Sequence, residues 1–225
     1  MQTDIRTVRA SEESARAFVY RVLSTYIREM FLHPGEKLAE TDVAAELQVS
    51  RTPVHDTFSR LEREKMLRPV PRGAVVPPLS ADTIRQTVWM HRTVCQAVLG
   101  ELYNHRPATL EPLERCVAAE LEALQGGAIV KMARLQLEFH RTLYKLAGRE
   151  PVMEAMERNS GDLYRLLRML ENADLWRYVA DQHSAIVQGL AMRDYELAAR
   201  ALEAEHDLVE PLLEECRYRQ PYFFE

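Results

Sequence analysis

Residues 38–76 read LAETDVAAELQVSRTPVHDTFSRLEREKMLRPVPRGAVV. Two short segments of this stretch repeat apolar residues every three or four positions, which predicts two amphipathic helices. The apolar positions are Val43, Ala44 and Leu47 in the first segment, and Val54, Phe58 and Leu61 in the second. Gln48-Val49 make the tight turn between them. Ser50 is a natural N-cap for the second helix, and Thr41 or Asp42 can cap the first.

A short β-branched segment follows the second helix. Arg68 to Val76 read RPVPRGAVV, and the tip of this segment, Arg72-Gly73, can take the positive φ that glycine tolerates well. We therefore expect a two-stranded ribbon after the second helix. Helix, turn, recognition helix and wing is the order of a winged helix-turn-helix unit, which reads DNA.

The stretch from Arg51 to Arg72 carries a local excess of positive charge. It holds six Lys and Arg residues against three Asp and Glu residues, whereas the whole chain of 225 residues has a net charge of −5. Basic residues therefore gather where a DNA-reading helix would lie. The acidic remainder is expected of a body that is held away from phosphates.

The rest of the chain has helical periodicity. One helix begins near Ser11 and carries an apolar stripe from Phe18 to Phe31. Pro77-Pro78 form a stiff linker, after which the pattern predicts an antiparallel bundle of about six helices. The expected bundle helices cover roughly 80–106, 110–124, 130–147, 151–169, 175–192 and 195–217. We expect a mostly α fold with a disordered tail at 1–10, a winged helix-turn-helix domain at 11–78 and a helical domain at 79–225.

Composition narrows the class of protein. The 47% of hydrophobic residues can supply a core for each of two domains. Three cysteines, at positions 95, 116 and 216, are odd in number and far apart, so they fit neither a disulfide framework nor a CxxC metal site. No stretch reaches the roughly 18 apolar residues that a membrane span requires. We expect a cytoplasmic protein with no membrane partner.

At this point the residues resemble a known family. The run VSRTPVHDTFSRLEREKMLRPVPRGAVV resembles the winged helix-turn-helix of GntR-type bacterial regulators, and PGEKLAE before it is similar to the usual start of that motif. Downstream, FHRTLYKLAG and DQHSAIVQGLAMRDYELAARALEAEH resemble the FCD effector domain of the FadR-like subgroup. The resemblance implies a homodimeric transcription factor, more often a repressor, that binds a near-palindromic operator in double-stranded DNA. It also implies that a small metabolite, often a carboxylate, binds in the bundle and changes the affinity for DNA.

Six residues are expected to contact DNA, and one of them, His55, departs from the family pattern. Ser50, Arg51 and Thr52 give the recognition helix a positive, hydrogen-bonding N-terminal end. Arg51 is expected to grip guanine O6 and N7 together, which is worth roughly 1–3 kcal/mol of discrimination. Arg72 and Gly73 would border the minor groove from the wing.

Two positions depart from the family pattern. Thr41 stands where an arginine is common, and Val54-His55-Asp56 stands where the motif usually reads VRE. Fewer fixed positive charges should weaken contacts with phosphate or guanine, so the operator is expected to differ from the usual family site. His55 either reads a base edge, adds positive charge at low pH, or is an exposed neutral side chain with little role.

The resemblance also implies a metal site in the bundle. The family takes an Asp and a His one turn apart on one helix and two His from the last two helices; the matching positions here are Gln136, His140, His183 and Glu205. Two imidazoles and a carboxylate can bind a divalent first-row metal such as zinc, nickel or manganese. His206 replaces Glu205 if the register shifts by one residue. Alternatively the changes to Gln136 and Glu205 mark a lost site, and the two histidines bond the effector directly.

Two further residues are expected to line the effector pocket. Arg92 matches a position where the subgroup often places an arginine that faces the pocket, and a buried guanidinium is a natural partner for a carboxylate. The alternative for Arg92 is an internal salt bridge to a bundle Asp or Glu. Tyr144 lies on the same helix as His140 and either lines the pocket or packs in the core.

Two other classes of function compete with the regulator. A metal-dependent enzyme could use His140, His183 and Glu205 as a metal triad with an open position. No nucleophile motif, phosphate-binding glycine loop or dinucleotide fingerprint accompanies these residues, and the chain has only eight glycines. A purely structural or protein-interaction bundle would leave the basic helix without a role. We therefore predict a DNA-binding regulator and not an enzyme.

Overall fold

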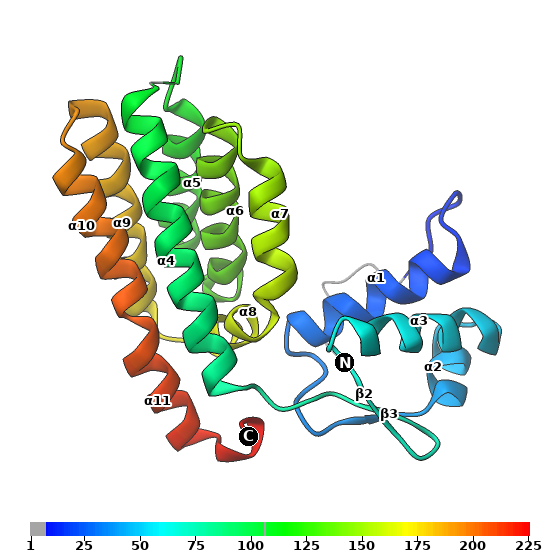
Figure 1. Ribbon diagram of the computed structural model, residues 1–225. Helices are drawn as coiled ribbons and strands as arrows, with labels where there is room; N and C mark the ends of the chain where they lie inside the picture. Colours follow the sequence, from blue (N-terminus) through cyan, green and yellow to red (C-terminus); the bar gives the residue numbers. More distant parts are fainter. Residues whose placement is uncertain (1–7, 106) are drawn as a thin grey trace. The chain divides into compact units, whose positions relative to one another are not determined.

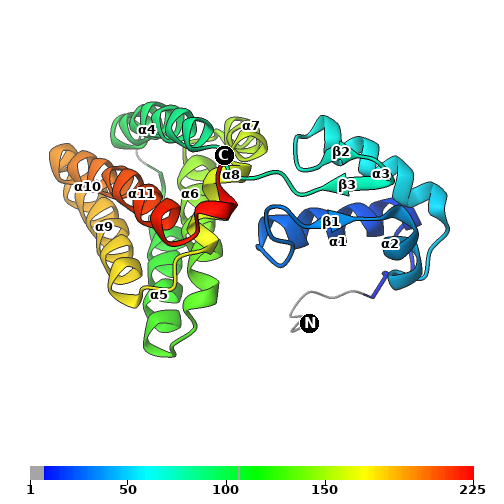
Figure 2. The same cartoon turned by 90° about the horizontal axis from the view of Figure 1, so that it is seen from below.

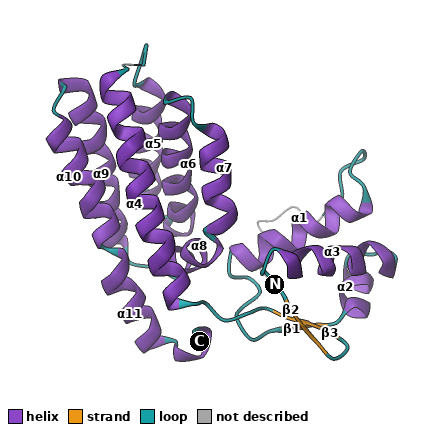
Figure 3. Cartoon of the chain, in the orientation of Figure 1, coloured by secondary structure: helices purple, strands orange, loops and turns teal. Residues whose placement is uncertain are grey.

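The computed structural model describes residues 8–105 and 107–225 and divides the chain into two compact units (Figure 1). The first unit runs up to Ser80 and also includes Gln220–Glu225, and the second unit is Ala81–Arg219. Most of the expected N-terminal tail, residues 1–7, lies outside the described residues. Figure 3 shows that strands occur in the first unit and that the second unit consists of helices and loops.

The first unit follows the order that the sequence predicts. Its elements are α1 Ala15–Arg28, β1 Lys37–Leu38, α2 Glu40–Glu46, α3 Arg51–Arg63, β2 Arg68–Val70, β3 Gly73–Val75 and the short 3-10 helix η2 Pro221–Phe223. Helix α1 is shorter than expected at both ends. The Ser14 hydroxyl accepts a hydrogen bond from the amide of Ala17 and so starts the helix there. Met30 takes a φ of 59°, which ends it before Phe31.

The caps of the next two helices differ from the prediction. Ala39, not Thr41 or Asp42, is the N-cap of α2, and the Thr41 hydroxyl donates to the carboxylate of Asp42 instead. Ser50 is the N-cap of α3 as predicted, but its side chain makes no capping hydrogen bond. The first turn of α3 therefore keeps N–H groups that its cap does not satisfy, which suits contact with an anionic partner.

The wing is a sheet of three strands, one more than the sequence predicts. The strand order is β1-β3-β2, and both pairings are antiparallel, with Leu38 opposite Ala74 and Pro69 also opposite Ala74. Strand β1 has only two residues, too few to produce an alternating pattern in the sequence. A Cβ atom at Gly73 would lie 2.0 Å from the carbonyl oxygen of Leu38, so β1 and β3 can approach only with glycine there.

The core of the first unit joins its helices to its sheet. The cluster contains Val19 and Ile27 of α1, Val54 and Leu61 of α3, and Ala74 of β3, all nearly or fully buried. The apolar stripes that predicted the helices are thus the faces that pack together. This packing leaves the opposite face of α3 to solvent.

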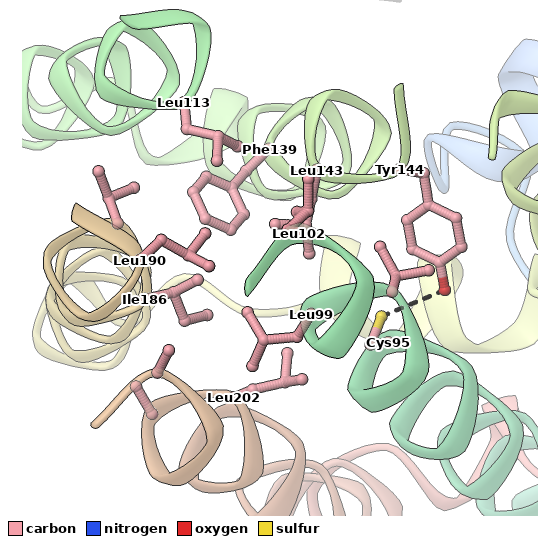
Figure 4. Packing of buried hydrophobic residues seen from close by; sticks show 14 of the residues in the cluster. Cys95, Leu99, Leu102, Leu113, Phe139, Leu143, Tyr144, Ile186, Leu190 and Leu202 are labelled. Carbon is pink, nitrogen blue, oxygen red and sulfur yellow. Dashed lines mark hydrogen bonds between the residues drawn. The ribbon is translucent and has the colours of Figure 1, made fainter. Parts of the chain in front are cut away.

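The second unit is an antiparallel bundle. Its elements are α4 Ala81–Asn104, α5 Glu111–Gln125, η1 Ile129–Lys131, α6 Met132–Leu146, α7 Glu150–Asn159, α8 Gly161–Arg168, α9 Ala173–Met192, α10 Tyr195–Asp207 and α11 Val209–Arg219. Helices α4, α5, α6, α9 and α10 pack side by side, as Figures 1 and 2 both show. Leu99, Phe139, Leu143, Ile186 and Leu202 converge in the middle of the bundle (Figure 4).

Two of the expected bundle helices are each divided. The helix expected at 151–169 breaks at Ser160, whose hydroxyl donates to the Met156 carbonyl, and Gly161 follows. Serine and glycine are poor residues for a helix interior. The helix expected at 195–217 breaks at Leu208 because Pro211 has no N–H with which to bond the carbonyl of Asp207.

The last residues of the chain pair with the linker. The Leu79 amide donates to the Phe223 carbonyl at 2.8 Å, and the Glu225 amide donates to the Leu79 carbonyl at 3.1 Å. Leu79 is fully buried, and the ring of Phe223 stacks on His33. The first unit therefore includes a C-terminal strap, residues 220–225. Among the described residues, no helix is both long and apolar enough to cross a lipid bilayer.

Candidate functional site

The N-terminal turns of α3 present a polar, exposed face. Ser50, Arg51, Thr52 and His55 are all exposed to solvent, whereas Val54 between them is fully buried. Within the described part of the chain, the guanidinium of Arg51 has no hydrogen bond or ion pair. A cation without a protein partner at the start of an exposed helix is available to a phosphate or a base edge.

Some of the other basic residues of this unit are already paired. Arg60 donates to the Glu64 carboxylate at 2.9 Å and lies 3.5 Å above the ring of Tyr20. The Arg16 guanidinium lies 3.7 Å from the carboxylate of Asp56. The positive charge that the sequence places between Arg51 and Arg72 is therefore unevenly available, and Arg51, at the N-terminal end of α3, has no ion-pair partner among the described residues.

His55 has a carboxylate partner. Its Nδ1 lies 2.9 Å from Oε1 of Glu40, the first residue of α2. The hydrogen bond and the negative charge of Glu40 raise the pKa of His55 above its ordinary value of 6.5. His55 thus brings a proton-dependent charge to the exposed face of α3, together with an acidic neighbour.

The wing tip places Arg72 at the turn between β2 and β3. The Arg72 side chain is exposed, and its backbone has a φ of 68°. Gly73 also has a positive φ, of 156°, and is partly buried against Leu38. Arg72 is therefore the side chain that the wing offers to a partner, whereas Gly73 serves the pairing of the strands.

A second candidate site is buried in the bundle. His140 of α6, His183 of α9 and Glu205 of α10 each offer one atom to a common point, and these atoms lie within 4.8 Å of one another. Nε2 of His140 is 2.9 Å from Oε1 of Glu205, and Nε2 of His183 is 3.4 Å from the same oxygen. All three side chains are buried. The sequence positions that the family resemblance points to do come together in space.

The histidines and carboxylates of this cluster stabilise one another's charges. Burial disfavours the imidazolium, but the carboxylates of Glu120 and Glu205 outweigh it and raise the pKa of His183 to about 9. Burial likewise opposes the charge of His140, and Glu205 nevertheless raises the pKa of His140 well above its usual value. Burial opposes ionisation of Glu205 as well, yet the two histidines hold its pKa well below the usual range. The site is therefore a buried set of mutually dependent charges.

Two polar atoms of the cluster lack hydrogen bonds. Among the described residues, Nε2 of His183 and Oε2 of Glu205 are buried and have no hydrogen-bond partner. Such atoms are costly to bury and usually have an explanation in a ligand, an ion or water. An imidazole nitrogen and a carboxylate oxygen are both common ligands of first-row divalent metals.

The other two positions of the expected set lie beside this triad. The Gln136 amide donates to Oε1 of Glu205 at 2.9 Å, so it faces the carboxylate as a hydrogen-bond donor. His206 is also buried, with its ring centroid 6.3 Å from that of His140, but its Nδ1 donates to the Leu202 carbonyl at 2.7 Å. The register of α10 thus places Glu205, and not His206, at the cluster.

Sequence reasoning missed two neighbours of the cluster. The Glu120 carboxylate of α5 lies 2.9 Å from Nδ1 of His183, and Cys95 Sγ of α4 lies 3.7 Å from Nδ1 of His140. Burial opposes ionisation of Cys95, but His140, His206 and His91 hold the pKa of its thiol well below the usual range. The position of Glu120 on the apolar stripe of a helix could have indicated that its carboxylate is buried. The sequence around Cys95 gives no comparable indication.

Tyr144 and Arg92 have different surroundings. Tyr144 is fully buried, and its hydroxyl points at Cys95 Sγ, 3.3 Å away (Figure 4). Arg92 does not lie in a closed pocket: 38% of its side-chain surface is exposed, and its guanidinium pairs with the carboxylate of Asp207. The internal salt bridge that was the alternative for Arg92 is the arrangement in this structure.

Comparison with known proteins assigns the family. Residues 15–76 match the family model of bacterial regulatory proteins of the gntR family, and residues 81–206 match that of the FCD domain. The chain belongs to the GntR family and carries an FCD domain. The two matched segments correspond to the winged unit and the bundle, and the residues of both candidate sites lie within them.

Relatives support the GntR assignment over most of the chain. A transcriptional regulator from an unstable DNA locus of Streptomyces ambofaciens is 28% identical over 93% of this chain and 89% of its own length. The transcriptional repressor RspR of Escherichia coli K12 is 24% identical over 82% of both chains. The solved structure of McbR/YncC from E. coli has the same fold, with a TM-score of 0.75, 17% identity, and coverage of 90% of this chain and 98% of that one.

The GntR relatives also decide between the classes of function. They are DNA-binding transcriptional regulators, and several are named repressors. The chain is therefore a transcriptional regulator, and the alternative of a metal-dependent enzyme has no support from its family.

Proposed function

We propose that this GntR regulator represses transcription as a homodimer that binds a near-palindromic operator, and that the occupant of the buried cluster in its FCD domain sets its affinity for DNA. The observation that carries the proposal is that one chain has both an exposed Arg51 on α3, without a partner among the described residues, and a buried His140–His183–Glu205 cluster. Several of its relatives are named repressors, which supports repression and not activation of transcription.

The DNA-reading part of the proposal rests on exposure and charge. Ser50, Arg51, Thr52 and His55 would face the major groove, and Arg72 would reach the backbone or the minor groove from the wing. Gly73 would keep the tip in place. Because Arg51 lacks a partner within the described residues, it loses no internal ion pair when it binds a guanine.

The metal part of the proposal rests on the donor set. His140, His183 and Glu205 would hold a divalent ion such as Zn²⁺, Ni²⁺ or Mn²⁺, with Gln136 hydrogen-bonded to Glu205 beside it. The unpartnered Nε2 of His183 and Oε2 of Glu205 fit this use. A divalent ion would supply a Lewis-acidic anchor for an anionic ligand.

The effector would be a small carboxylate. A carboxylate suits a site that offers a metal ion, and Tyr144 lies beside His140 through their shared contact with Cys95. Arg92 would take part only if the effector draws its guanidinium from Asp207. The effector can change DNA affinity only if it binds two arrangements of the protein unequally.

The dimer would form through the bundle. Trp89 of α4 is 70% exposed, which is unusual for so large an apolar side chain, and Thr93 and Ala97 are exposed one and two turns further along the same helix. A second copy of the chain that covers this face would set the spacing of two recognition helices on the operator.

Binding to a labelled duplex from the region upstream of the protein's own gene tests the proposal. Wild-type protein should bind it selectively over a shuffled duplex, and the affinity should fall steeply with salt. Arg51→Ala should lose at least about fivefold in selective affinity, which corresponds to the lower end of a bidentate guanine contact. Arg63→Ala, at the exposed C-terminal end of α3, is the matched control and should bind nearly as wild type.

Equal losses in Arg51→Ala and Arg63→Ala would contradict the proposed reading of DNA by the start of α3. Circular dichroism and metal binding by the bundle report whether the Arg51→Ala chain is folded. A folded Arg51→Ala chain that keeps full selectivity would overturn the role of Arg51.

A further inference from the structure

Glu120 is a carboxylate in an apolar position. It lies on α5 in line with Leu113 and Val117, which belong to the core, and it is 0% exposed. Within the described residues, its hydrogen bonds go to one group, Nδ1 of His183, which lies 2.9 Å from both carboxylate oxygens. A buried ion pair is seldom more stabilising than well-packed apolar side chains, so stability does not by itself account for this pair.

The hydrogen bond to Glu120 fixes which nitrogen of His183 is available. Because Nδ1–H donates to Glu120, Nε2 is the ring atom left to act as a ligand. Nε2 is buried, has no hydrogen-bond partner among the described residues, and lies 3.4 Å from Oε1 of Glu205. The Phe139 ring stacks on the imidazole with centroids 3.8 Å apart and planes 8° apart, which fixes the plane of the ring.

His140 lacks an equivalent anchor. Its Nδ1 faces Cys95 Sγ at 3.7 Å, whereas Nδ1 of His183 lies 2.9 Å from both carboxylate oxygens of Glu120. Its other nitrogen, Nε2, is already 2.9 Å from Glu205. Of the two histidines, His183 is therefore the one whose ligand atom is directed by a carboxylate outside the triad.

Glu120 also completes the charge of the cluster. Glu205 brings one negative charge, Glu120 brings a second, and Gln136 is neutral. Two carboxylates with two neutral imidazoles balance one divalent cation, whereas Glu205 alone would leave a loaded site with a net positive charge in a buried place. Buried net charge is costly, so the second carboxylate favours a divalent ion.

We propose that Glu120 is a positioning residue of the metal centre: it holds His183 with its proton on Nδ1, aims Nε2 at Glu205, and supplies the second negative charge that balances a divalent ion. The inference rests on the proposed metal binding by His140, His183 and Glu205. It assigns to α5 a part in a site whose other residues lie on α6, α9 and α10.

Competition between the full-length protein and a coloured chelator for Zn²⁺, repeated with Mn²⁺, tests the proposal. Glu120→Gln keeps an acceptor oxygen but removes the charge, and Glu120→Ala removes both. We expect losses in metal affinity of about tenfold and about a hundredfold, the range found for residues that orient a metal-bound histidine. Glu122→Gln, on the exposed side of the same helix, is the control and should bind metal as wild type.

The outcomes separate this inference from the proposed function. If His183→Gln weakens metal binding and folded Glu120→Gln stays within twofold of wild type, Glu120 has no positioning role although the metal site stands. If neither wild type nor His183→Gln binds metal at about one ion per chain, both proposals are wrong.

A measurement on the wild-type chain does not depend on the folding of any variant. Long-range ¹H–¹⁵N spectra of the protein with ¹⁵N-labelled histidine, recorded with saturating Zn²⁺, report which nitrogen of His183 carries a proton. We expect a proton on Nδ1 and none on Nε2. The opposite tautomer would overturn the positioning role, and a merely structural role for Glu120 would not predict either result.

Discussion

His55 and Glu40 make the charge of the DNA-reading face depend on pH. The Nδ1 of His55 lies 2.9 Å from the Glu40 carboxylate, and both residues belong to the helix pair of the winged unit. A family arginine at this position would carry a fixed charge, whereas histidine carries a charge that is lost as the pH rises. The reading face of this regulator is therefore weaker in fixed charge and more responsive to its surroundings.

The raised pKa of His55 predicts how the charge of its side chain changes with pH. Glu40 favours the imidazolium, so His55 should keep its proton as pH rises past 6.5 and lose it only at the higher, folded-state value. NMR titration of the His55 ring should show a midpoint above 6.5, and Glu40→Gln should move that midpoint down. Because the lost charge lies on the proposed DNA-reading face, operator affinity should fall through the same pH interval.

Glu36→Gln provides the control for the His55 titration, because Glu36 pairs with His33 and not with His55. It should leave the His55 midpoint where it is in the wild type. An unchanged midpoint in Glu40→Gln would mean that the Glu40 contact does not form in solution.

Single residues of the buried cluster were predictable only through family positions. His140, His183 and Glu205 are far apart in sequence, and only the packing of α6, α9 and α10 brings them to one point. Glu120 interrupts an apolar stripe, a sign of a buried partner, but a sequence does not show which helix faces that stripe. The contact of Arg92 with Asp207 was likewise one of two alternatives until the bundle was seen.

At the scale of elements, the hairpin of α9 and α10 holds two of the three cluster residues. The helices pack closely at Gly189, where a Cβ atom would lie 2.7 Å from the amide nitrogen of Ala198 and 2.8 Å from the carbonyl oxygen of Asp194. Both neighbours are backbone atoms that cannot rotate away. Glycine at position 189 thus allows α9 and α10 to pack closely.

Gly189→Ala should therefore destabilise the bundle. Forcing a methyl group into a packed contact costs typically 1–3 kcal/mol, so the urea midpoint should fall accordingly. Gly100→Ala in α4 is the matched control: nothing lies within 4 Å of its Cβ position, and alanine favours the helix by about 0.5–1 kcal/mol. Equal stability of the two variants would contradict the close packing of α9 on α10.

The sequence predicted the helices that have a strong apolar periodicity, but it did not predict where those helices end. The apolar stripes correctly located α1, α3, α4 and α9, because burial of one face determines a helix. The break at Leu208 was missed because periodicity continues through Pro211, whose missing N–H decides the boundary. The strand β1 was missed because its two residues gain their structure only by pairing with β3.

At the scale of the whole molecule, the chain joins a unit that reads DNA to a bundle with a buried charged cluster. Leu79 of the linker pairs with Phe223 and Glu225 of the C-terminal strap, so the connection between the units involves two segments of chain and not only Pro77-Pro78. The charge distribution of the sequence predicted which of the two units binds DNA. The strap was not predicted, because backbone pairing between distant residues leaves no pattern in composition or period.

We propose above all that the occupant of the buried cluster controls the affinity of the protein for DNA. The direct test is the Kd of wild-type protein for its upstream duplex, measured on one preparation as purified, after chelation, and after Zn²⁺ is restored, with metal content determined at each step. We predict a reversible change of at least about fivefold, the lower end of typical coupling between two sites. An unchanged Kd, while the metal content falls from about one per chain to none and returns, would contradict the claim.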